Sequence, residues 1–81
     1  MRIGVGDYVR IKNVPSAKKR WYAHNYAGKV GKVVDLDGDT NILDVAFVDG
    51  VSLWFDSSSL EPADEREYLI AEAAHALGVG P

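Results

Sequence analysis

Apolar and polar residues alternate along several short segments of the chain, and this alternation predicts β-strands. The clearest segments are residues 8–13, 42–48 and 51–55, and a further strand is expected at residues 28–35. Because alternate side chains of a strand point to the same face, one apolar set should lie in a common core. The side chains that we expect there are Val9, Ile11, Leu43, Val45, Phe47, Val51, Leu53, Phe55 and Leu60.

Glycine and aspartate mark the turns between these strands. Asp49-Gly50 is a strong hairpin signal, and Asp37-Gly38-Asp39 indicates a second turn. Gly28 and Gly31 lie three residues apart at the start of a strand, which indicates a bulge or a close approach of two backbones. The strands are therefore short and sharply connected.

The period of the apolar residues becomes helical near the C-terminus. Pro62 fits the first position of a helix, and Gly78 is suited to end it. We expect a helix over residues 62–77 whose apolar face packs against the rest of the protein; a two-fold contact with a second copy is the alternative. The residues at helical spacing are Leu69, Ile70, Ala73, Ala74 and Leu77.

These elements predict a mainly β protein, a small barrel of about five strands with one C-terminal α-helix. With 81 residues, the chain is expected to form a single domain. The barrel is assigned to residues 1–61, and the helix at residues 62–78 is expected to pack on it.

Between the first two predicted strands, residues 14–28 show neither a strand nor a helix period. Loops of this length are often functional. Basic and aromatic side chains are concentrated here, and they suit either a protein interface or stacked, phosphate-bearing nucleotides. Alternatively, an aromatic ring closes the barrel while the basic groups are solvated. The candidate binding residues are Lys18, Lys19, Arg20, Trp21, Tyr22, His24 and Tyr26, extended by Lys29 and Lys32.

Trp54 is a further candidate binding residue. It alternates with Leu53 and Phe55, so its ring should face away from their side of the strand. It is then available either for an aromatic platform with Tyr8 or for packing against the C-terminal helix.

Charge is divided unevenly along the chain, whose net charge is -3. Residues 1–32 carry a net charge of +7 and residues 33–81 carry -10. A basic surface would favour an acidic or phosphate-rich partner. The alternative is that basic and acidic segments become neighbours in the folded protein.

Several kinds of chemistry lack support in the sequence. There is no cysteine, and His24 and His75 lack a third ligand at metal spacing. A calcium loop starting at Asp35 would need glycine at Thr40 and glutamate at Ala46. No nucleophile elbow or Walker loop is present. We therefore expect a protein that is not an enzyme and has no cofactor or metal.

The hydrophobic content of 47 % is ordinary for a globular domain. No apolar run is long enough to span a membrane, and no segment reads as a signal peptide. We expect a cytoplasmic protein without a membrane partner.

Two segments carry a resemblance to a known fold family. Residues 6–11 read Gly-Asp-Tyr-Val-Arg-Ile, and residues 28–33 read Gly-Lys-Val-Gly-Lys-Val. This pair of strands around a long loop resembles the KOW type of SH3-like barrel. The loop is also similar to that of a large-subunit ribosomal protein of archaea and eukaryotes, with Pro15-Ser16 near its start and His24 and Tyr26 near its end.

Nitrile hydratase β-subunits and small electron-transport accessory barrels are similar as well. Their last strands end in a similar series of two phenylalanines, a leucine and a glutamate. The corresponding residues here are Phe47, Phe55, Leu60 and Glu61. The resemblance covers residues 4–61 and implies a fold that hosts many binding functions. Small barrels of this kind also occur in bacteriophages. The acidic net charge is unlike that of a ribosomal protein, and the Ala-Leu-Tyr-Asp-Tyr stretch of signalling SH3 domains is missing.

Together, these features favour a non-enzymatic protein-interaction module, an adaptor or accessory subunit, that uses loop 14–28 and Trp54. Its partner is expected to be a protein with an acidic surface, bound by a monomer or weak dimer. Binding of RNA or DNA through the same loop is the first alternative. Assembly through the helix is the second.

Overall fold

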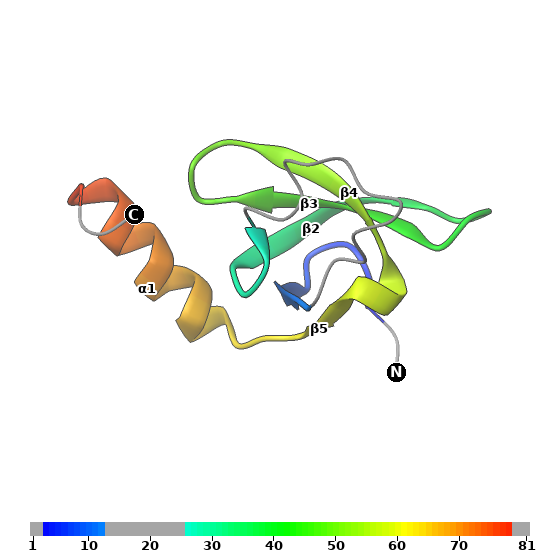
Figure 1. Cartoon of the computed structure of the whole chain (residues 1–81), viewed down its shortest axis with the longest axis horizontal. Coiled ribbons are helices and arrows are strands. Elements are labelled where there is room, and N and C mark those ends of the chain that lie inside the picture. The colour runs from blue at the N-terminus through cyan, green and yellow to red at the C-terminus, as the bar shows by residue number, and fades with distance from the viewer. Residues whose placement is uncertain (1–2, 13–25, 79–81) are drawn as a thin grey trace.

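The computed structural model describes residues 3–12 and 26–78. They form one five-stranded antiparallel sheet followed by a C-terminal helix, which confirms the predicted fold class (Figure 1). The elements are β1 (Tyr8–Ile11), β2 (Val30–Asp37), β3 (Ile42–Phe47), β4 (Ser52–Asp56), a 3-10 turn (Ser57–Ser59), β5 (Leu60–Pro62) and α1 (Glu65–Ala76).

The strands lie in the order β4-β3-β2-β1-β5, so β1 joins strands from the two ends of the sequence. Val9 in β1 is opposite Gly31 of β2 on one side and Pro62 of β5 on the other. The register between β2 and β3 shifts between Val33 and Asp35. Such a bulge bends a strand, which helps the sheet to curve around its own core.

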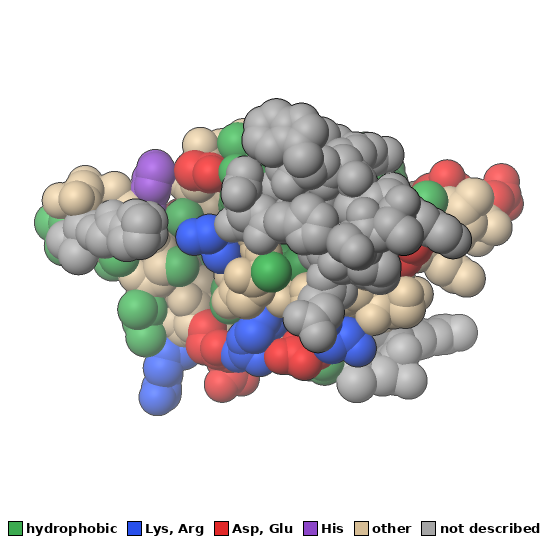
Figure 2. Space-filling view, in the orientation of Figure 1, with side chains coloured by type: hydrophobic (Ala, Val, Ile, Leu, Met, Phe, Trp, Pro, Cys, Tyr) green, Lys and Arg blue, Asp and Glu red, His purple; other side chains and the backbone are tan. Residues whose placement is uncertain are grey.

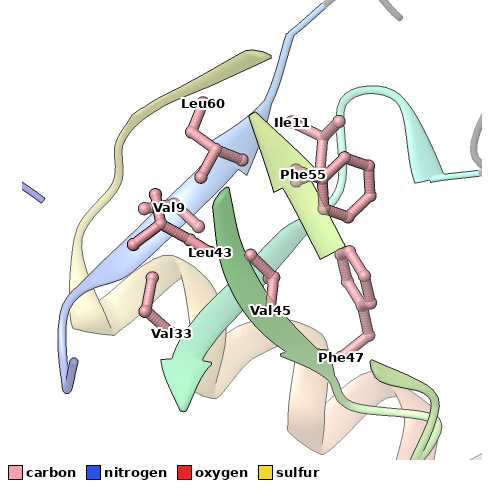
Figure 3. Packing of buried hydrophobic residues seen from close by; sticks show 8 residues of the cluster. All are labelled: Val9, Ile11, Val33, Leu43, Val45, Phe47, Phe55 and Leu60. Atoms are coloured by element: carbon pink, nitrogen blue, oxygen red, sulfur yellow. The ribbon is translucent and has the colours of Figure 1, made fainter. Parts of the chain in front are cut away.

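The concave side of this sheet holds the hydrophobic core. Its eight buried side chains point toward one another from all five strands (Figure 3). They are Val9, Ile11, Val33, Leu43, Val45, Phe47, Phe55 and Leu60. Seven of them were predicted from the sequence; of the two other predicted residues, Leu53 is partly buried and Val51 is exposed.

At Gly31, strands β2 and β3 approach each other closely. A Cβ atom at this position would lie 2.5 Å from Val45 Cγ1 and 2.8 Å from the carbonyl oxygen of Ala46. Both distances are too short for a side chain, so the close approach predicted from the two spaced glycines is confirmed at Gly31.

The hairpin predicted at Asp49-Gly50 is also present. Gly50 has a φ of +89°, a conformation that glycine adopts without strain. Asp49 Oδ1 accepts a hydrogen bond from the backbone N–H of Val51 at 3.0 Å, and the N–H of Phe47 donates to the carbonyl of Val51 at 2.8 Å.

The helix begins later than predicted. Pro62 belongs to β5, opposite Val9, and α1 starts at Glu65 after the N-cap residue Asp64. Asp64 and Glu67 form a capping box, in which the N–H of Asp64 donates to Glu67 Oε2 at 3.1 Å. Glu67 therefore sets the start of the helix, and Pro62 contributes to the preceding strand instead.

The prediction that the larger apolar side chains of the helix pack against the rest of the protein is wrong. Leu69 is 49 % exposed, Ile70 is 63 % exposed and Leu77 is 77 % exposed, and Ala73 is exposed as well. The half-buried face carries Glu67, Tyr68, Ala71 and Ala74 instead.

Contacts at the first turn of α1 explain this orientation. The ring of Tyr68 lies 5.2 Å from the ring of Tyr8, centroid to centroid. Arg10 forms ion pairs with Glu67 and, at 2.7 Å, with Glu61. These contacts with β1 fix the rotation of the helix about its axis, so the larger aliphatic side chains point away from the sheet. The helix ends at Ala76, and Gly78, just beyond the cap residue Leu77, has a φ of +71°, as expected of a glycine that terminates a helix.

Candidate functional site

A cleft of about 590 Å³ lies between the sheet and the inner face of α1. Its apolar wall comes from Val30 and Phe47 in the sheet, from Val48 just after β3, and from Ala71 and Ala74 in the helix. The two alanines leave this space because their side chains are too short to reach the sheet. Small side chains on the helix thus leave room for a cleft whose other wall carries larger residues of the sheet.

Charged and polar groups surround the apolar wall. Lys29 precedes β2, Asp49 lies in the β3–β4 turn, and His75 comes from the last turn of the helix. Three separate segments therefore supply a cation, a carboxylate and an imidazole around one apolar surface. This combination suits an apolar side chain flanked by polar or charged groups.

Tyr26 connects the cleft to the core. Its ring lies 4.3 Å from that of Phe47, and its hydroxyl donates a hydrogen bond to Asp49 Oδ2 at 2.8 Å. Burial raises the pKa of Tyr26, and the hydrogen bond to the Asp49 carboxylate raises it further. The ring therefore packs inward, as in the alternative in which an aromatic residue closes the barrel.

Asp49 is held in its ionised form. Partial burial alone would raise its pKa, but hydrogen bonds from the N–H of Val51 and the hydroxyl of Tyr26 lower it below its usual value. His75 adds to this lowering through its charge. The cleft is consequently lined by a carboxylate at Asp49 and by the side chain of Lys29.

The outer face of the sheet holds two other predicted site residues. Lys32 Nζ lies 5.8 Å from the centre of the Tyr8 ring, within the range of a cation–π contact. Trp54 is 41 % exposed, which agrees with the predicted outward orientation, and it lies opposite Asp44. Since β2 and β3 separate Trp54 from Tyr8, the structure does not bring these rings into a shared platform.

Asp44 is an unusual group on this face. Its Oδ1 atom is buried and has no hydrogen-bond partner among the residues that the structure describes. Burial raises the pKa of Asp44, and the facing carboxylate of Asp35 raises it further. The sequence analysis did not select Asp44 for this property, because it depends on a residue brought opposite by the sheet register.

The structure divides the predicted site. Tyr26 and Lys29 line the cleft, whereas Lys32 and Trp54 lie on the outer face of the sheet. Six predicted residues lie outside the described ranges: Lys18, Lys19, Arg20, Trp21, Tyr22 and His24.

Reasoning from the sequence missed several lining residues of the cleft. In the sequence, Asp49 indicates only a turn, and His75 stands out only as a histidine without a third ligand at metal spacing. Ala71 carried no signal, and Ala74 was grouped with the apolar helix residues. The strand register and the rotation of the helix bring these residues together, and neither is encoded in a local motif.

Basic and acidic segments do become neighbours in the fold. Arg10, from the basic segment, is paired with Glu61 and Glu67 from the acidic segment. Figure 2 shows side chains of both signs alternating along one edge of the molecule. Part of the positive charge near the N-terminus is therefore neutralised within the protein.

The described residues hold neither a metal-binding cluster nor a membrane-spanning helix. Across residues 3–12 and 26–78, no three histidine, aspartate or glutamate side chains are placed to hold a metal ion. The only helix in these ranges is too short and too polar to cross a bilayer.

Comparison of the chain with family models, with curated protein sequences and with solved structures gave no match.

Proposed function

We propose that this protein is a non-enzymatic protein-interaction module that binds its partner at the cleft between the sheet and α1. The cleft itself carries this proposal. It has a volume of about 590 Å³, and its apolar wall is flanked by Lys29, Asp49 and His75. Protein interfaces commonly place an apolar anchor in such a pocket and surround it with polar contacts.

From its sequence, we include the basic and aromatic loop of residues 14–28 in the proposed binding surface. Tyr26, near the end of the loop, lines the cleft, and Lys29 follows it. Lys18, Lys19 and Arg20 belong to the same segment of sequence. An acidic patch on the partner would be attracted by these cations while an apolar side chain enters the cleft.

We also infer that the sheet is an SH3-like barrel of the KOW type. Support comes from the strand order β4-β3-β2-β1-β5, the long connection between β1 and β2, and the bend at Val33–Asp35. This fold hosts many binding proteins, so it agrees with the proposed function without specifying the partner.

Protein binding is favoured over nucleic-acid binding by the charges around the cleft. The lowered pKa of Asp49 keeps a carboxylate in the cleft, and outside the cleft Arg10 is already paired with two carboxylates. A phosphate backbone would be repelled by these acids, whereas a protein surface can present a complementary pattern.

The test is a pull-down from lysate of the source cells, with and without nuclease. The baits are the unaltered protein, the K29E variant, a triple variant with Lys18, Lys19 and Arg20 changed to glutamate, and the K12E variant. Lys12 is exposed but does not line the cleft, so K12E matches K29E in charge.

We expect a nuclease-resistant protein band that K29E and the triple variant lose and K12E retains. Equal loss with K12E would show that net charge, rather than this surface, controls binding. Material that disappears on nuclease treatment would instead establish nucleic-acid binding. With the captured partner purified, the triple variant should slow association roughly tenfold at low salt and flatten its salt dependence.

A further inference from the structure

The outward face of α1 is an apolar stripe with no part of the described chain covering it. The stripe consists of five side chains, all of them exposed: Leu69, Ile70, Ala73, Ala76 and Leu77. On the opposite face of the same helix, Tyr68 packs against Tyr8, and Ala71 and Ala74 line the cleft. The helix lies at one end of the molecule (Figure 1), and the stripe is exposed among the residues that the structure describes.

The stripe is symmetric about Ala73. Apolar residues lie three and four positions before it, at Ile70 and Leu69, and three and four positions after it, at Ala76 and Leu77. A two-fold axis beside Ala73 therefore generates an antiparallel helix pair in which every stripe residue meets another stripe residue. Leu69 meets Leu77 of the second copy, Ile70 meets Ala76, and Ala73 meets its own equivalent. Such self-complementarity is the requirement for a two-fold interface.

Side-chain size also suits this arrangement. Ala73 lies at the centre of the stripe, where the two helices come closest, and an alanine keeps little bulk between the backbones. The larger Leu69 and Leu77 lie toward the two ends of the stripe, where each can cover its counterpart.

The charge at the end of the stripe is complementary too. Arg66 is exposed, lies one turn before Leu69 and Ile70, and shares their face of the helix. In the antiparallel pair, each Arg66 lies beside the C-terminal end of the other helix, where the free carbonyl groups carry partial negative charge. A parallel pair would instead place the two arginines together.

We propose that this chain self-associates through the outward face of α1 as an antiparallel two-fold dimer. The occupant of the stripe is a second copy of the same helix, because its pattern and end charges complement themselves. The proposal does not depend on the cleft, which uses the opposite face. Five side chains, two of them alanines, bury much less than the ~800 Å² per partner of a standard interface, so the dimer is weak.

Cysteine cross-linking can test both the contact and its direction, because the chain contains no cysteine. The A73C variant places one thiol beside the two-fold axis, within the short Cα separation that a disulfide requires. The T40C variant is the control, since Thr40 is exposed in the β2–β3 turn.

Under mild oxidation, we expect A73C to form covalent dimers at least tenfold faster than T40C. A mixture of L69C and L77C should cross-link between the two variants rather than within each. Equal rates for A73C and T40C would overturn the proposal. Preferential L69C–L69C dimers would establish parallel pairing and overturn the antiparallel arrangement.

Sedimentation velocity over a wide concentration range tests the unmodified contact. We expect the mean mass to rise toward that of a dimer, and A73E to return the protein to a monomer without loss of its circular dichroism. The matched control is A27E, because Ala27 is an exposed alanine outside α1. A monomer at all concentrations up to ~1 mM, the weak end of measurable association, would overturn the proposal. So would the finding that a different protein covers the stripe.

Discussion

The sheet and the helix of this protein differ in what they bury. The sheet encloses eight hydrophobic side chains, five of them 1 % exposed or less, whereas α1 has no fully buried residue. The helix is held mainly near its first turn, by Tyr68 against Tyr8 and by Glu67 with Arg10. The comparison indicates that the sheet is the stable unit of the fold. The helix is an attached element that exposes apolar side chains.

The largest predicted difference in stability between the two regions comes from replacing a leucine with alanine in each. Leu43 is 1 % exposed in the core, and Leu69 is 49 % exposed on the helix. L43A should lower the free energy of unfolding by about 2–5 kcal/mol, because it removes buried contacts and leaves a cavity. L69A should change it by ~0.5 kcal/mol or less, as at other exposed positions.

Urea denaturation followed by tryptophan fluorescence measures both variants. Similar losses for L43A and L69A would contradict the distinction between a packed sheet and an attached helix.

Gly31 tests the tightness of the sheet at one backbone position. The added methyl group of G31A would meet Val45 Cγ1 and the carbonyl oxygen of Ala46 at distances shorter than real contacts. We expect a loss of about 1–3 kcal/mol, as for other overpacked sites. G38A is the control, because a Cβ at Gly38 meets nothing within 4 Å. Thermal unfolding that leaves G31A as stable as G38A would show that β2 and β3 separate easily.

A smaller effect is expected where the helix starts. D64A removes the N-cap side chain of the capping box and should cost about 1 kcal/mol of helix stability. Because the sheet is packed independently, the loss should appear as faster amide hydrogen exchange in α1 and not in β3. Equal acceleration in both elements would show that helix and sheet unfold as one unit.

The smallest predicted effect is an increase in the free energy of unfolding, caused by a substitution at Asp44. The pKa of Asp44 is raised by burial and by Asp35, so the folded protein binds a proton at this carboxyl more tightly than the unfolded chain does. Its contribution to stability is therefore fully present below the ordinary pKa of 3.8 and is lost as the pH rises through the raised value. D44N should be more stable than the unaltered protein at pH 7, by up to ~1 kcal/mol, the range of cross-strand pair effects.

This gain should shrink as the pH is lowered, because Asp44 then becomes protonated in the unaltered protein. Urea titrations of both proteins at pH 7 and pH 4 give the difference directly. A gain that is independent of pH would rule out the charge on Asp44 as its cause.

The sequence predicted the sheet well because its signals are local. Val9 and Ile11 alternate with polar neighbours, and Leu43, Val45 and Phe47 do the same, so the buried face follows from the period of a strand. The hairpin at Asp49-Gly50 and the tight approach at Gly31 were likewise visible in short motifs.

The helix was predicted less well because its orientation depends on distant residues. Leu69 and Ile70 are more hydrophobic than Ala71 and Ala74, and their spacing alone favours them as the inner face. Contacts with Tyr8 and Arg10, more than fifty positions earlier, reverse that preference.

The cleft could not be predicted for the same reason. It requires Tyr26, Asp49 and His75 to converge from three parts of the chain.

The position of β5 has a consequence for how the protein folds during its synthesis. Strand β1 emerges from the ribosome early, yet one of its two edges is completed only by Leu60–Pro62. Until those residues are available, that edge keeps unpaired amide and carbonyl groups and can pair with another nascent chain. Cooperative folding therefore waits until nearly the whole sheet has been translated, and premature release before Leu60 yields a product prone to aggregation.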